Sequence, residues 1–149
     1  MRKTRILVID DHELIRRNIC CLLAAQPDFD VIDEAENGTE AIRKSEELQP
    51  DLVLLDISIP EPNGLRALPH IKKIAPRVKV LIVTNHDEQV FVEEALRAGA
   101  DGFLSKAQIW THLIPTVRRV LGGEILISAP GASEPGSEPS KASPTGAEA

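Results

Sequence analysis

The sequence contains few of the groups that stack on bases or cross-link a chain. It has no Tyr, one Trp and three Phe in 149 residues. Aromatic platforms for the bases of a nucleic acid are therefore not expected. The only cysteines, Cys20 and Cys21, are adjacent. Neighbouring residues do not form an ordinary disulfide and two thiols alone do not make a zinc site, so we expect one of them simply to face a core.

Long apolar runs and an excess of basic residues are also missing. No run approaches the roughly 20 apolar residues that span a bilayer. The basic start, residues 1–5, leads into a strand-like run and not into the core of a signal peptide. The formal net charge is −6, which argues against a surface that binds a phosphate backbone. We therefore expect a cytoplasmic protein that contacts no membrane.

Five short apolar runs alternate with five segments of helical period along the chain. The runs cover residues 6–9, 31–35, 52–55, 78–83 and 102–105, and the helical segments cover 12–25, 39–48, 65–75, 88–98 and 109–121. Strands that are apolar throughout are buried on both faces, which is typical of a parallel sheet covered by helices on both sides. We predict an α/β fold with a doubly wound, five-stranded parallel sheet. Pro69 and Pro115 should kink or shorten their helices.

The composition changes abruptly after Ser128. Residues 129–149 include four prolines and no large apolar side chain. Such a segment cannot bury enough surface to offset the entropy of ordering it. We predict one folded domain over residues 1–124 and a disordered tail, rich in Pro, Ser, Gly and Ala, over residues 125–149.

Chemically active side chains follow four of the five predicted strands. They are Asp10 and Asp11, then Asp56, Thr84 and Lys106. Ligands of open parallel sheets bind beyond the carboxyl ends of the strands, so these groups should lie on one rim. A charged loop residue is usually just solvated, but packing alone does not predict five such groups at matching strand ends.

Three neighbouring carboxylates repel one another unless a cation lies among them, and oxygen ligands favour Mg²⁺ or Ca²⁺. Mg²⁺ needs only one or two carboxylates together with phosphate oxygens. A carboxylate is also a nucleophile for phosphorus. The pattern therefore favours phosphoryl transfer to Asp56, with Lys106 supplying positive charge and Thr84 a hydroxyl donor.

Five segments together resemble the receiver domain of two-component response regulators. They are residues 6–12, 51–60, 63–65, 83–84 and 99–106, and the resemblance extends over about residues 4–124. It implies the flavodoxin-like (βα)5 fold with strand order 2-1-3-4-5. The stretch 99–128 is similar to receivers that precede a LuxR-type helix-turn-helix. About 20 polar residues are too few for such a DNA reader, so we expect a single-domain regulator without one.

The resemblance also implies roles for the acidic residues. Asp56 would take phosphate from a sensor histidine kinase or a phosphotransfer protein. Asp11 and Asp56 would bind Mg²⁺ directly with the backbone carbonyl of Ser58, and Asp10 would act partly through water.

A second group of residues is implied in switching. Thr84 and Phe103 would move together on phosphorylation, although a phenylalanine such as Phe103 is more often simply a core residue. The output would be contact with a downstream protein or a second copy through the fourth and fifth helices. Asn85 replaces a residue that is usually small in the family and could narrow access to Asp56. We hypothesise that His86 tunes the lifetime of the acyl phosphate, the alternative being a plain exposed histidine; we expect His12 to be solvated.

Two other functions are compatible with the pattern. A pseudo-receiver would keep the fold as an interaction module that is never phosphorylated, and Asn85 gives that reading some weight. A phosphohydrolase with an aspartyl nucleophile is the weaker alternative, because neither a cap nor a substrate pocket is evident. We predict a phosphoacceptor that assists its own phosphorylation and slow dephosphorylation, and not a turnover enzyme.

Overall fold

The predicted alternation of strands and helices is confirmed by a computed structural model, which describes residues 2–86 and 88–127. The elements are β1 (Thr4–Ile9), α1 (Glu13–Ala24), β2 (Phe29–Ala35), α2 (Gly38–Leu48), β3 (Leu52–Leu55), α3 (Gly64–Ile74), β4 (Lys79–Thr84), α4 (Gln89–Arg97), β5 (Gly102–Ser105), a 3₁₀ turn η1 (Lys106–Gln108), α5 (Ile109–Leu121) and β6 (Leu126–Ile127). Within these residues, no helix combines the length and apolar character needed to cross a membrane.

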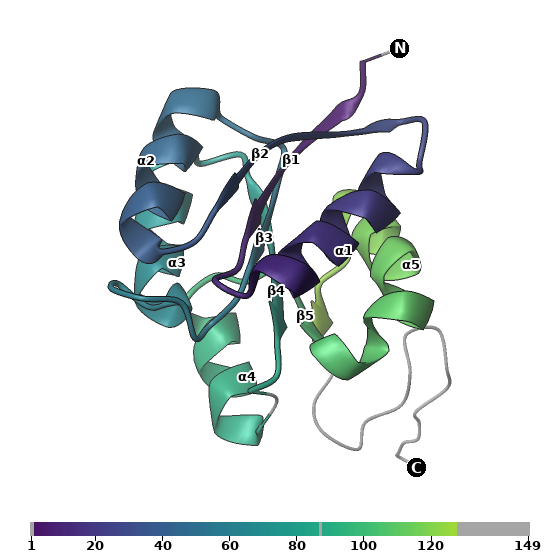
Figure 1. Cartoon of the computed structure of the whole chain (residues 1–149). Helices are drawn as coiled ribbons and strands as arrows, with labels where there is room; N and C mark the ends of the chain where they lie inside the picture. The colour runs from purple at the N-terminus through teal and green to yellow at the C-terminus, as the bar shows by residue number, and fades with distance from the viewer. Residues whose placement is uncertain (1, 87, 128–149) are drawn as a thin grey trace.

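The strands form one parallel sheet in the order β2-β1-β3-β4-β5-β6. The predicted flavodoxin-like order 2-1-3-4-5 is therefore confirmed, with one short strand added at the β5 edge. Helices α1 and α5 cover one face of the sheet, and α2, α3 and α4 cover the other (Figure 1). Because every strand runs the same way, the carboxyl ends of β1, β3, β4 and β5 meet at one edge.

Two apolar clusters fill the space between the sheet and its helices. Alternate residues of a strand point to opposite faces, so β1 contributes Leu7 and Ile9 to one cluster and Ile6 and Val8 to the other. The first cluster packs against α2, α3 and α4, and the second against α1 and α5. Burial on both sides explains why β3 is apolar throughout, whereas β2, at the edge of the sheet, has exposed polar residues.

Two local expectations differ from the structure. Leu126 and Ile127 lie in the range predicted as tail, but they pair with Gly102 and Phe103 as strand β6. The rest of the tail prediction falls on residues 128–149, outside the described residues. The helical period that Leu14 shares with Ile15, Ile19 and Leu23 predicts a buried side chain, but Leu14 is 73% exposed.

Neither helix proline shortens its helix. α3 runs through Pro69 and α5 runs through Pro115, and both helices end within a residue of the predicted position. Both prolines are exposed, so their rings project away from the core. The buried faces of these helices offset the lost hydrogen bond. The expectation for cysteine holds: Cys20 packs against the core and Cys21 is exposed.

Candidate functional site

The sheet itself fixes two of the carboxylates. The backbone N–H of Asp10 donates to the Ala35 carbonyl at 3.1 Å, and that of Asp56 donates to the Ile9 carbonyl at 3.1 Å. Both residues thus extend the hydrogen bonding of β1 and β3, which are neighbours in the sheet. Each residue is only 1% exposed. Two buried carboxylates therefore lie side by side on rigid backbone.

Lys106 reaches these carboxylates from the end of β5, which is two strands away from β3 in the sheet. It follows β5, and its Nζ lies 2.7 Å from Asp10 Oδ2 and 2.8 Å from Asp56 Oδ2. Burial by itself would lower the pKa of Lys106, but hydrogen bonds and charge interactions with the two carboxylates outweigh it and raise the pKa above its usual range. The ammonium therefore keeps its proton and balances one of the negative charges.

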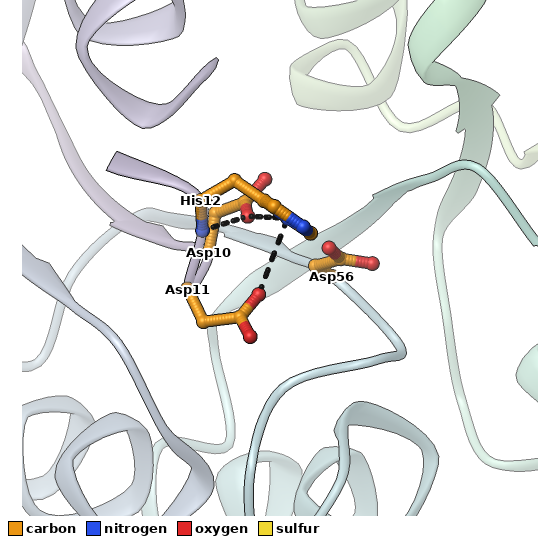
Figure 2. A group of neighbouring side chains, drawn as sticks. All are labelled: Asp10, Asp11, His12 and Asp56. Atoms are coloured by element: carbon orange, nitrogen blue, oxygen red, sulfur yellow. Dashed lines mark hydrogen bonds and ion pairs between the residues drawn. The ribbon is translucent and has the colours of Figure 1, made fainter. Parts of the chain in front are cut away.

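Asp11 lies at the mouth of this pocket. Its side chain is 31% exposed and its Oδ1 lies 3.3 Å from the Nδ1 of His12. That oxygen is shielded from solvent and has no hydrogen-bond partner. By contrast, Asp10 Oδ1 accepts the backbone N–H of His12 at 2.9 Å and lies 3.2 Å from its ring. Figure 2 shows the four side chains of Asp10, Asp11, His12 and Asp56 around a common centre.

The residues present fit a hard divalent cation. One ligand atom from each of Asp10, Asp11, His12 and Asp56 lies within 4.8 Å of the others. Three carboxylates face the single ammonium of Lys106, so the pocket carries excess negative charge. The shielded Asp11 oxygen accepts no hydrogen bond, and the His12 ring 3.3 Å away balances its charge only when protonated, so a cation would satisfy it. Carboxylate oxygens suit Mg²⁺, Ca²⁺ or Mn²⁺.

Ser58 adjoins the pocket from the loop after β3. Its N–H donates to Asp56 Oδ1 at 3.3 Å and its hydroxyl to Asp56 Oδ2 at 3.4 Å. These contacts, with the Lys106 ammonium, orient the Asp56 carboxylate. Gly64 allows the loop to stay close, because a Cβ there would lie 2.2 Å from the Asp56 carbonyl oxygen.

Thr84 ends β4, which lies between the strands that carry Asp56 and Lys106. Thr84 is fully buried, and its Oγ1 accepts the backbone N–H of His86 at 3.2 Å. Phe103 is 1% exposed within the cluster under α2, α3 and α4. Its burial suits a core residue and a switch residue equally, so its role stays a prediction.

Asn85 and His86 both lie exposed after β4. The ring of His86 meets the ring of Phe91 in α4 edge to face, with the centroids 5.6 Å apart. His86 thus links the end of β4 to α4. The predicted effects of Asn85 on access and of His86 on phosphate lifetime stay predictions.

Sequence reasoning missed two residues at the pocket. The side chain of His12 is 58% exposed, as expected, but its ring also approaches Asp10 and Asp11, a contact that the sequence did not indicate. Arg16 is nearly buried beneath Asp10, and its Nη1 donates to the Asp10 carbonyl at 2.7 Å. Arg16 falls on the stripe of Ile19 and Leu23, and a charge on an apolar stripe is a signal that could have identified it.

Known proteins match the chain over the part that builds this pocket. A family model described as the response regulator receiver domain matches residues 6–118. The transcriptional regulatory protein DegU of Brevibacillus brevis is 37% identical over 121 residues, which is 81% of this chain and 51% of DegU. The response regulator protein VraR of Staphylococcus aureus is 38% identical over 120 residues, which is 80% of this chain and 57% of VraR. The chain thus spans about half the length of these curated relatives.

A solved structure shares the architecture as well. The signal receiver domain of the putative response regulator NarL from Mycobacterium tuberculosis superposes with a TM-score of 0.79 at 31% identity. The match covers 83% of this chain and 100% of that domain. The residues that match the family model, 6–118, include every strand end that carries a pocket residue.

Proposed function

The chain belongs to the response regulator receiver domain family of two-component systems, and from that premise we propose that Asp56 accepts a phosphoryl group in a Mg²⁺-dependent reaction. One observation carries the proposal. The buried Lys106 ammonium bridges Asp10 and Asp56, while Asp11 stands at the mouth with a shielded oxygen that accepts no hydrogen bond. This arrangement offers a nucleophile, a fixed positive charge and a place for a cation.

The residues divide the phosphoryl transfer among them. A carboxylate oxygen of Asp56 attacks phosphorus, the new O–P bond forms, and the bond from phosphorus to the donor breaks with its electron pair leaving on the donor. Lys106 keeps its proton and pairs with a phosphoryl oxygen, because its ammonium already faces Asp56 Oδ2. The Thr84 hydroxyl can donate to another oxygen, since its oxygen accepts the His86 N–H and leaves the hydroxyl proton free for that role.

Mg²⁺ would be held by Asp11, Asp56 and the Ser58 carbonyl, and when bound it would neutralise oxygens of the transferring group. Asp10 would contribute partly through water, because its Oδ1 accepts the His12 N–H and its Oδ2 pairs with Lys106. Asp11 is the natural direct ligand because its Oδ1 lacks a donor.

The partners follow from the family. The phosphoryl donor would be a sensor histidine kinase or a phosphotransfer protein, and the output would be a protein contact or a homodimer made through α4 and α5. The His86–Phe91 contact supports this direction, because it connects the end of β4 with α4. We place this exchange in the cytoplasm. The chain would be a phosphoacceptor with slow self-dephosphorylation and not a turnover enzyme.

Intact mass after incubation with Mg²⁺ and a small phosphodonor tests the proposal. The wild type should gain one phosphoryl group, and Asp56→Asn should gain none. Asp30→Asn is the matched control, because Asp30 is an exposed aspartate of β2 paired with Arg5 at the other end of the sheet. An unshifted wild-type mass would indicate a pseudo-receiver, and rapid multiple turnover of the donor would indicate a hydrolase.

A further inference from the structure

A buried guanidinium lies directly behind the acidic pocket. Arg16 sits in α1 with its side chain only 11% exposed. Its Nη1 donates to the backbone carbonyl of Asp10 at 2.7 Å, and its Nε donates to Glu34 Oε1 in β2 at 2.7 Å. One side chain therefore ties the end of β1 to both α1 and β2.

Packing alone does not account for an arginine at this position. The buried stripe of α1 consists of Arg16, Ile19 and Leu23, so an aliphatic residue would complete it. Burying a charge is costly unless it is paired. Burial by itself would lower the pKa of Arg16, but the hydrogen bond and charge of Glu34, with Glu36 and Glu13, raise it above its usual range. The charge is retained, and its hydrogen bonds are short.

The contact with Asp10 constrains the residue that follows. The Asp10 N–H is held by the Ala35 carbonyl, and the Asp10 C=O is held by Arg16. Because a peptide unit is planar, fixing this C=O fixes the plane that contains the Asp11 nitrogen and Cα. Arg16 therefore fixes the direction in which the backbone continues from the end of β1 to Asp11.

We propose that Arg16 is a positioning residue that orients the Asp10–Asp11 peptide for cation binding, and that Glu34 holds its guanidinium in place. This inference rests on the proposed Mg²⁺-dependent function. It assigns to α1 and β2 a share in shaping a pocket whose carboxylates come from β1 and β3.

Charge and geometry predict opposite effects of Arg16 on the cation. A positive charge near the pocket repels Mg²⁺, whereas orienting Asp11 favours it. Arg16→Lys separates the two, because lysine keeps the charge but lacks the planar fork that reaches two partners at once. Loss of a contact that orients a metal ligand costs about tenfold or more in metal affinity. We therefore expect Arg16→Lys to raise the Mg²⁺ dissociation constant about tenfold.

The experiment measures Mg²⁺ binding by calorimetry and the phosphorylation rate as a function of Mg²⁺ concentration. In Arg16→Lys the Mg²⁺ concentration that gives half of the maximal rate should rise. The phosphorylation rate at saturating Mg²⁺ should stay close to that of the wild type. Glu34→Gln should shift the half-saturation in the same direction but less, because a neutral amide oxygen still accepts from the guanidinium. The double variant should be no worse than Arg16→Lys alone, since both act through one contact.

Arg17→Lys is the matched control, because Arg17 is 70% exposed on the same helix and pairs along it with Glu13. Its Mg²⁺ dissociation constant should equal that of the wild type. Thermal unfolding without Mg²⁺ shows whether each variant is folded, and Glu34→Gln serves if Arg16→Lys is not, because Glu34 is 41% exposed.

The outcomes separate this inference from the proposed function. A wild type that binds no Mg²⁺ overturns both. A wild type that binds Mg²⁺, with Arg16→Lys and Glu34→Gln binding equally well or more tightly, overturns the role of Arg16 alone. An equal loss of rate at every Mg²⁺ concentration, together with a lower unfolding temperature, shows a purely structural role and also overturns it.

Discussion

A single ammonium group separates the two most buried carboxylates of the pocket. Lys106 bridges Asp10 and Asp56. Its side chain is only 3% exposed, so water screens the charges of this contact very little. Removing one partner of a buried ion pair leaves the other charges uncompensated. We expect Lys106→Met to lower the free energy of unfolding by about 3 to 5 kcal/mol. Urea unfolding measures this loss, and Mg²⁺ should restore part of it.

The pH dependence provides a check on the same residue. The folded-state pKa of Lys106 is raised, so its stabilisation is fully present below the ordinary lysine pKa and is lost as pH rises through the raised value. The wild type should therefore lose stability above about pH 10 that Lys106→Met does not lose. Lys73→Met, at an exposed lysine of α3, should behave like the wild type. Parallel alkaline curves for wild type and Lys106→Met would contradict this account.

His86 lies two residues after Thr84, just beyond the end of β4, and we hypothesise that its imidazole limits the access of water to an acyl phosphate on Asp56. Its ring packs on Phe91 beside the end of β4. Removing it should open the mouth of the pocket, so His86→Ala should lose its phosphoryl group faster than the wild type. The decay of the phosphorylated mass after removal of the donor measures this. His70→Ala changes an exposed histidine of α3 and should leave the decay unaltered. Equal lifetimes for His86→Ala and wild type would end the hypothesis.

Residues at strand ends were predictable, and residues that act through a docked helix were not. Asp10 and Asp56 follow continuous apolar runs, so their place at the rim follows from strand polarity alone. The contacts of His12 and Arg16 depend on how α1 leaves the strand and packs beside β2. Local sequence does not specify that docking angle.

At the scale of elements, the approach of α3 to β3 shapes the loop beside Asp56. The N–H of Gly64 donates to the Ile57 carbonyl at 2.8 Å, and the side chain of Asn63 caps α3 by accepting the Arg66 N–H. A Cβ at Gly64 would lie 2.2 Å from the Asp56 carbonyl oxygen and 2.8 Å from the Ile57 Cα. Both of these are backbone atoms, so the N-terminal end of α3 would have to shift to accommodate the Cβ.

Gly64→Ala should therefore cost about 1 to 3 kcal/mol of stability and slow the phosphorylation of Asp56. Denaturant unfolding and the initial rate of phosphorylation measure the two effects. Gly122→Ala is the matched control, because a Cβ there meets its nearest atoms at 3.4 and 3.5 Å, an ordinary contact. If Gly64→Ala matched this control in both measurements, the close packing of α3 would not matter to the site.

Periodicity identified the helices but not the width of their buried stripes. Leu14 belongs to the period of Ile15, Ile19 and Leu23, yet the sheet covers only part of α1 and Leu14 projects to solvent. Strand β6 has two residues, too few for a pattern, and forms because the edge of β5 offers backbone partners. Both differences arise from tertiary contacts that a window of sequence does not contain.

At the scale of the whole molecule, cation binding and folding are linked. A ligand that binds only the folded state stabilises it, by about 2.7 kcal/mol at a concentration one hundred times its dissociation constant. We expect Mg²⁺ to raise the unfolding temperature of the wild type and to leave that of Asp11→Asn almost unchanged. Differential scanning calorimetry measures both, with Asp30→Asn as the control that keeps the wild-type shift. A full shift in Asp11→Asn would remove Asp11 from the ligand set.

The fold class was accessible from sequence because five buried strands in a parallel sheet leave few topologies. The order of the first five strands is as predicted, and the sheet brings together segments that are 50 residues apart in the chain, such as Asp56 and Lys106. Metal identity, donor and output partner depend on surfaces and ligands that strand order does not determine.

The parallel direction of β6 has a practical consequence for attaching labels. β1 begins at the amino ends of the strands, opposite the pocket. Because β6 runs parallel to β5, the backbone at Ile127 runs toward the carboxyl ends of the strands, where the pocket lies. A dye or affinity tag placed before Thr4 would therefore stand clear of an incoming phosphodonor. One inserted directly after Ile127 would start from the half of the domain that carries Asp10, Asp56 and Lys106.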